Sequence, residues 1–215
     1  MHKRFLILTL ILISTQLIAA PMSYKGSVTT MGEAFKHYSK IETSYAISAK
    51  DSIGIKAFKA KGDGYHVDAG ALFYLTRLMR INEIESQTNL WLYAETGLIN
   101  IEKNNRDDDR FYVSPTIQFD YETRRIYTMV SHQILRVAHD NFDTTKAKAG
   151  FSFYKTEYNE TQPWFILEVS HTNSMSEKLE VIPTIRLINK ALYFEARSEE
   201  HTSELQSQFR ISYAV

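Results

Sequence analysis

Alternation of apolar and polar residues along many short segments is the feature that most constrains this chain. Segment 111–121 shows it clearly, because every second side chain is apolar, aromatic or proline. The positions of that face are Phe111, Val113, Pro115, Ile117, Phe119 and Tyr121. Segments 165–170, 179–187 and 209–215 repeat the pattern. Successive side chains of a β-strand point to opposite faces, so these segments are predicted strands with one apolar face.

The alternation predicts an antiparallel up-and-down sheet. Strands are expected near 40–49, 52–60, 66–79, 89–101, 110–121, 125–138, 145–156, 163–172, 179–188, 191–196 and 208–215, and segment 25–31 supplies a first one. Bacterial single-chain barrels use an even number of strands. We therefore expect about twelve strands, with ten as the alternative. Pro115 and Pro183 interrupt two of them and are expected to form β-bulges, because proline donates no ladder hydrogen bond.

The connections between these strands are expected to alternate in length. Short ones are predicted near 50–51, 86–89, 122–124, 159–162 and 189–190. Longer polar ones are predicted near 61–65, 104–109, 139–144 and 173–178. Short periplasmic turns and longer outer loops are typical of outer-membrane barrels.

The first twenty residues have the layout of a secretory signal peptide. Lys3 and Arg4 precede an apolar run over 5–13, and small residues follow at Ala19 and Ala20. The run is too short for a spanning helix of about 20 residues. We expect residues 1–20 to be removed on export, which leaves 21–215 as one β-barrel domain.

Segment 197–207, RSEEHTSELQS, interrupts the strand-rich chain with polar residues of no matching period. It resembles the translation of a common sequencing adapter. We interpret it as a non-native insertion and draw no metal site from its acidic and histidine residues; a native outer loop is the alternative.

Composition agrees with an exported barrel. The chain has no cysteine, so disulfides do not hold it together, and 13% of its residues are aromatic, as interfacial girdles require. Its 25 basic and 25 acidic residues balance, which gives no basis for nucleic-acid binding. Taken together, the chain resembles small Gram-negative outer-membrane β-barrel proteins as a class. That resemblance implies an all-β, antiparallel transmembrane barrel in contact with outer-membrane lipid and lipopolysaccharide.

If the apolar faces meet lipid, charged residues of both signs point into the lumen. The predicted lumen network is Glu95, Asp120, Glu168, Glu180, Arg186 and Glu195. Buried charges persist when they are paired, so one interpretation is that these residues fill and rigidify the interior. The other is a polar pathway or a small binding site. Twelve strands lie between filled eight-stranded barrels and open sixteen-stranded channels, which permits either.

A catalytic alternative rests on His171 and Ser174, near the end of a predicted strand. Segment 171–174, HTNS, resembles the His-x-Ser motif of outer-membrane phospholipase A and, more loosely, of lipid A deacylases. In that motif histidine acts as base for serine. Here serine follows histidine by three positions rather than two, so the two residues do not share a strand face.

The expected function is therefore a non-enzymatic outer-membrane barrel, either a narrow pore or a barrel that binds a small polar solute. The alternatives are a lipid hydrolase and a soluble periplasmic β protein. No cofactor or metal is expected, because the seven histidines show no metal-ligand spacing.

Overall fold

The computed structural model describes residues 24–34, 38–62, 65–103, 106–138, 140–157, 159–173, 179–190, 192–197 and 208–214. These residues form twelve strands: β1 (Val28–Ala34), β2 (Tyr38–Ala46), β3 (Asp51–Gly62), β4 (Tyr65–Asn82), β5 (Ser86–Lys103), β6 (Arg106–Thr123), β7 (Ile126–Val137), β8 (Asp140–Ser152), β9 (Gln162–Thr172), β10 (Glu180–Asn189), β11 (Leu192–Arg197) and β12 (Gln208–Ala214).

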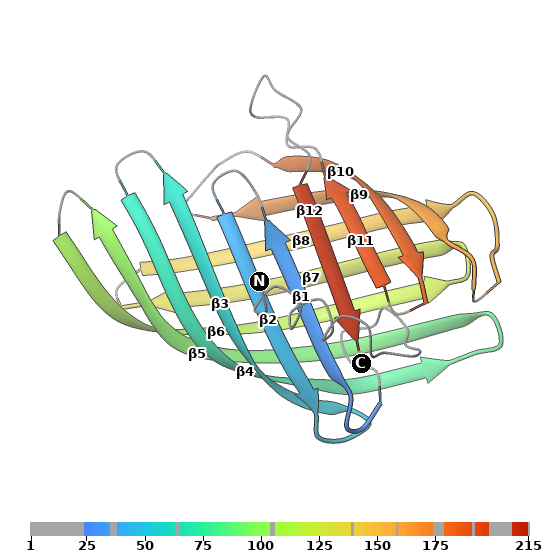
Figure 1. Ribbon diagram of the computed structural model, residues 1–215, viewed down its shortest axis with the longest axis horizontal. Coiled ribbons are helices and arrows are strands. Elements are labelled where there is room, and N and C mark those ends of the chain that lie inside the picture. Colours follow the sequence, from blue (N-terminus) through green and yellow to red (C-terminus); the bar gives the residue numbers. More distant parts are fainter. Residues whose placement is uncertain are drawn as a thin grey trace, which may run out of the picture.

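The strands close into one antiparallel barrel (Figure 1). Each strand pairs with its neighbours in the chain, and β1 completes the ring by pairing with both β2 and β12. Thr29, for example, lies opposite Ser44 on one side and Ala214 on the other. Closure leaves no free sheet edge. The predicted up-and-down barrel and its count of twelve strands are confirmed.

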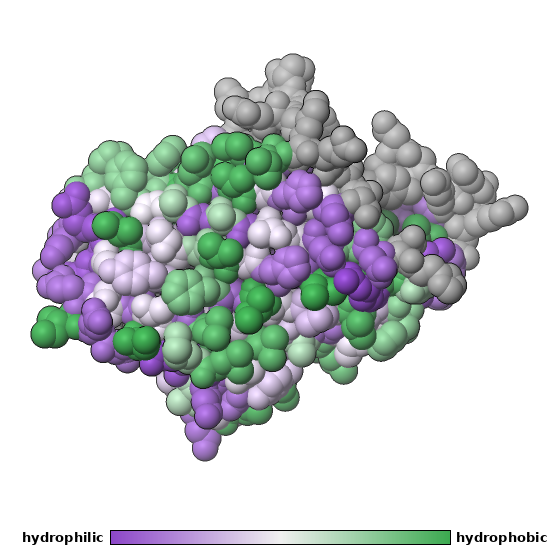
Figure 2. Space-filling view, turned by 180° about the vertical axis from the view of Figure 1, so that it is seen from behind, coloured by the Kyte–Doolittle hydropathy of each residue, from purple (hydrophilic) through white to green (hydrophobic). Residues whose placement is uncertain are grey.

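The barrel is apolar outside and polar inside. On β6, Tyr112 and Ser114 are only 2% and 1% exposed, whereas their neighbours Phe111 and Val113 are 61% and 39% exposed. Hydrophobic side chains occupy much of the outer face seen in Figure 2. A protein dissolved in water buries its apolar face against a core, so the exposed apolar surface opposes the soluble periplasmic alternative.

Register aligns the outward side chains in rows across neighbouring strands. One row is apolar from β6 to β10: Phe119, Val130, Ala147, Val169 and Val181. The next row, one pleat farther from the chain termini, changes to polar residues at His132, Thr145 and His171 on β7, β8 and β9. This change from apolar to polar side chains marks the border of the apolar belt that lies farther from the chain termini on those strands.

Three predicted long loops consist mostly of strand residues instead. Residues 62 and 65, 103 and 106, and 137 and 140 pair directly across hairpins. The charged segments 106–109 and 140–143, which we predicted as loops, therefore belong to β6 and β8. Between β8 and β9 the prediction was wrong in the opposite direction. We expected a short turn near 159–162, but residues 153–161 separate the two strands. The predicted loop over 173–178 lies almost entirely outside the described residues.

The long hairpins explain this difference. Strands β4, β5 and β6 have 18 residues each, whereas a tilted strand crosses a bilayer in about 9–11. The ends of these hairpins project beyond an apolar belt of that height, and charged residues can pair there as strands while their side chains stay in water. Charge alone therefore did not indicate a loop.

The predicted bulges at Pro115 and Pro183 are absent, because both prolines keep the register of their strands. Pairing of β6 with β7 is interrupted at residues 114 and 115. Pro115 therefore lies where β7 forms no ladder pair with β6. The register shift in the described strands falls in β4 instead, between Arg77 and Met79.

The predicted signal peptide, residues 1–20, lies outside the described residues, as does all of the adapter-like segment except Arg197. Within the described part of the chain, no helix is long and apolar enough to cross a membrane.

Candidate functional site in the barrel lumen

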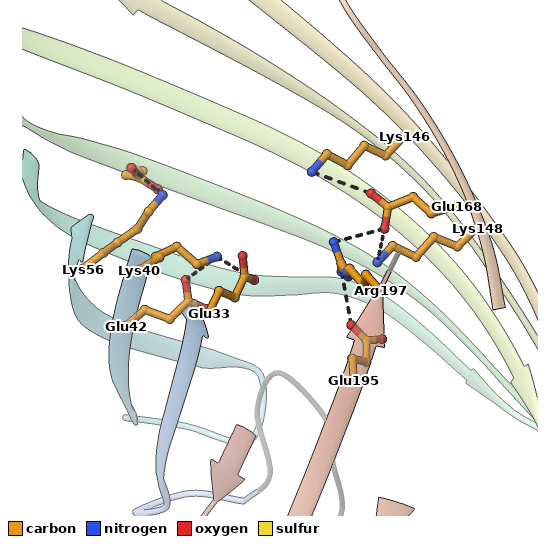
Figure 3. A network of polar contacts seen from close by, with 10 residues as sticks. Glu33, Lys40, Glu42, Lys56, Lys146, Lys148, Glu168, Glu195 and Arg197 are labelled. Carbon is orange, nitrogen blue, oxygen red and sulfur yellow. Dashed lines mark hydrogen bonds and ion pairs between the residues drawn. The ribbon is translucent and has the colours of Figure 1, made fainter. Parts of the chain in front are cut away.

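The lumen contains charged side chains arranged in small clusters on facing walls (Figure 3). The first, which we call the acidic triad, consists of Glu33, Lys40 and Glu42 on β1 and β2. The Lys40 ammonium lies 3.0 Å from a Glu33 oxygen and 3.5 Å from a Glu42 oxygen. All three side chains are 12–15% exposed. Two carboxylates thus share one ammonium, and the triad has a formal charge of −1.

A second cluster joins β3, β5 and β6. The Lys56 ammonium donates to both Glu95 oxygens, at 2.9 and 2.7 Å, and the Tyr112 hydroxyl donates to Glu95 Oε1 at 2.7 Å. Lys56 also lies 5.6 Å from the centroid of the Phe58 ring. This cluster is neutral and holds its charges by pairing.

A third cluster, the basic triad, consists of Lys146 and Lys148 on β8 and Glu168 on β9. Lys148 lies 2.7 Å from Glu168 and is 7% exposed. Lys146 lies 3.9 Å from the other Glu168 oxygen and is 41% exposed, so its ammonium faces lumen water. Arg197 on β11 also contacts Glu168, at 3.5 Å, and pairs with Glu195 at 3.1 Å. The one carboxylate of the triad is outnumbered by its two ammonium groups, so the three residues have a formal charge of +1.

Nearer the end of the barrel at which β1 begins, Arg186 projects into the interior. Its guanidinium donates two hydrogen bonds to Glu195 Oε1, at 2.9 and 2.8 Å. The same group lies 4.6 Å from the Tyr127 ring and 4.8 Å from the Tyr193 ring. Tyr127 belongs to β7 and Tyr193 to β11, so Arg186 bridges distant parts of the wall. These side chains occupy the interior at this level.

Asp120 is the centre of a group of hydrogen bonds at the same end of the interior. Its carboxylate accepts hydrogen bonds from Asn89 Nδ2 at 2.7 Å and Trp91 Nε1 at 2.6 Å, and all three residues are at most 7% exposed. Arg80 in turn donates to Asn89. Both carboxylate oxygens accept a hydrogen bond, which is the condition under which a buried charge is tolerated.

Of the six predicted lumen residues, five lie in these clusters: Glu95, Asp120, Glu168, Arg186 and Glu195. Glu180 is exposed at the far end of β10, where it accepts a hydrogen bond from Ser170. Sequence reasoning missed their partners Lys56, Lys146, Lys148 and Arg197, and it missed the whole acidic triad. The alternation of segment 52–60 could have indicated Lys56, because it shares a face with Ser52 and Gly54.

The catalytic alternative remains an untested prediction. His171 is half-buried on the outward-facing row, opposite Thr145, and Ser174 lies outside the described residues. Among the described residues, no three histidine, aspartate or glutamate side chains are grouped to hold a metal ion.

Comparisons with known proteins agree with this architecture. No protein-family model and no curated protein matches the sequence. Among solved structures, the barrel resembles barrels of outer-membrane proteins in fold. It is similar to a KdgM porin, with a TM-score of 0.53, 9% identity, and coverage of 87% of this chain and 97% of that one. A KdgM porin in complex with disordered oligogalacturonate gives the same TM-score and coverage at 11% identity. The β domain of the Bordetella autotransporter BrkA gives a TM-score of 0.46 at 11% identity, covering 87% and 97% of the two chains.

Proposed function

We propose that this chain forms a narrow outer-membrane pore for small polar solutes. The observation that carries the proposal is the closed barrel with an apolar exterior and a lumen lined by charged side chains. Such an exterior suits contact with hydrocarbon, and a charged lining suits contact with water and polar solutes.

The same features support a location in the outer membrane. A chain with a predicted signal peptide and lipid-facing strands is suited to the outer membrane of a Gram-negative bacterium. There its exterior would meet outer-membrane lipid and lipopolysaccharide. Oligogalacturonate, with which a KdgM porin forms a complex, is a polar solute, and this supports a polar solute for the present barrel as well.

The level around Arg186 limits what passes. Its guanidinium is held by Glu195 and two tyrosine rings, so a solute that crosses this level must pass beside a fixed cation. Charged side chains that line a pore set its selectivity. We therefore expect a small conductance.

Planar-bilayer recording of the purified protein tests the proposal. We expect discrete conductance steps that increase in size in the double variant Arg186→Ala/Glu195→Ala, which removes both charges of this pair together. Arg197, which also donates to Glu195, keeps its contact with Glu168 at 3.5 Å. The matched control is Lys59→Ala, because Lys59 is 74% exposed on the outer face. A correctly folded protein that inserts but conducts no ions would contradict the proposal.

A further inference from the structure

The acidic and basic triads have opposite excess charge, and they face each other. The labelled side chains of the two triads come from opposite walls in Figure 3. Because β1 and β2 lie across the ring from β8 and β9, the two triads face each other through the lumen rather than along the sheet.

In each triad the excess charge is on a loosely held member. In the basic triad, Lys148 is tightly paired at 2.7 Å, while Lys146 is at 3.9 Å and is the more exposed. In the acidic triad, Glu33 is held at 3.0 Å and Glu42 at 3.5 Å. Lys146 and Glu42 are therefore the charges that a solute can engage without breaking a short ion pair.

From this arrangement we propose that the lumen binds small zwitterionic solutes. The carboxylate, sulfonate or phosphate of the solute meets Lys146, and its ammonium group meets Glu42. The inference rests on the proposed pore and names its preferred class of solute. A neutral solute gains neither contact, and a solute with one charge gains one contact while facing the like charge of the opposite triad.

Liposome swelling tests the inference. The probes are β-alanine, which is zwitterionic at neutral pH, and lactamide, a neutral molecule of similar size, so neither carries net charge through the pore. We expect β-alanine to enter roughly threefold to tenfold faster, the range that two solvent-exposed ion pairs supply. Lys146→Gln and Glu42→Gln should each bring the ratio toward one, while Lys59→Gln on the outer face should leave it unchanged.

Salt selectivity supplies a second readout. In a KCl gradient, Lys146→Gln should shift the reversal potential toward cation preference and Glu42→Gln toward anion preference. Equal entry of β-alanine and lactamide into liposomes containing the native protein would overturn the inference and leave the pore standing. Entry of neither solute, with the barrel folded in the vesicles, would overturn the pore itself.

Discussion

The ion pair between Arg186 and Glu195 gives the sharpest test of the interior. Glu195 is fully buried. Its Oε1 accepts two hydrogen bonds from the Arg186 guanidinium, which is also enclosed by two aromatic rings, and its Oε2 accepts one from Arg197 at 3.1 Å. Glu195→Gln keeps the volume but removes the charge. Loss of one partner of a buried pair costs about 3–5 kcal/mol, because the remaining charge is left uncompensated. We expect a loss at the lower end, about 3 kcal/mol, since the amide oxygen still accepts one hydrogen bond.

Urea unfolding of the protein in lipid vesicles, followed by the fluorescence of its two tryptophans, measures this loss. The control is Asp68→Asn, which breaks the exposed pair of Lys59 and Asp68, with side chains 74% and 54% exposed. That pair should contribute no more than about 1 kcal/mol. Equal losses in Glu195→Gln and Asp68→Asn would refute a buried, stabilising ion pair in the lumen.

Three further substitutions probe the fold with the same unfolding assay. Gly97→Ala places a Cβ against the carbonyl oxygen of Gly70 and should cost about 1–3 kcal/mol, whereas Gly70→Ala meets no atom within 4 Å and should be tolerated; similar losses in both would contradict the close approach. Asp120→Ala removes the carboxylate that accepts from Asn89 and Trp91, at about 1–3 kcal/mol for each lost bond, and unchanged stability would show that these bonds do not form. Leu167→Lys puts a charge on the apolar belt of β9, midway between Phe165 and Val169, and should cost about 2–4 kcal/mol, so a neutral effect would argue against lipid contact.

The number of strands could be predicted from the sequence, and so could the side chains of each strand that face outward. Both depend on the period of two, which is local and regular in segments such as 111–121. The lengths of the hairpins could not be predicted in the same way. Charged residues at 106–109 are compatible with a loop and with a strand that leaves the membrane, and only pairing with 100–103 distinguishes the two.

The lumen clusters were predictable in part. Alternation indicates that Glu168 and Arg186 point inward, because it is a property of each strand alone. Their partners depend on register and on the curvature of the whole ring. Arg186 meets Tyr127 from a strand three positions away, and no local pattern links those residues. The division of charge between two walls likewise emerges only after closure.

Cysteine scanning of β6 tests the central claim most directly, because the native chain has no cysteine and each variant then carries one reporter. Cysteines are introduced singly at Thr116, Ile117, Gln118 and Phe119 in outer-membrane vesicles. A water-soluble maleimide should label positions 116 and 118, while a bilayer-dissolved quencher should reach labels at 117 and 119. Equal labelling of all four positions by the water-soluble reagent, or the reverse alternation, would contradict a barrel with a polar lumen and a lipid-facing exterior.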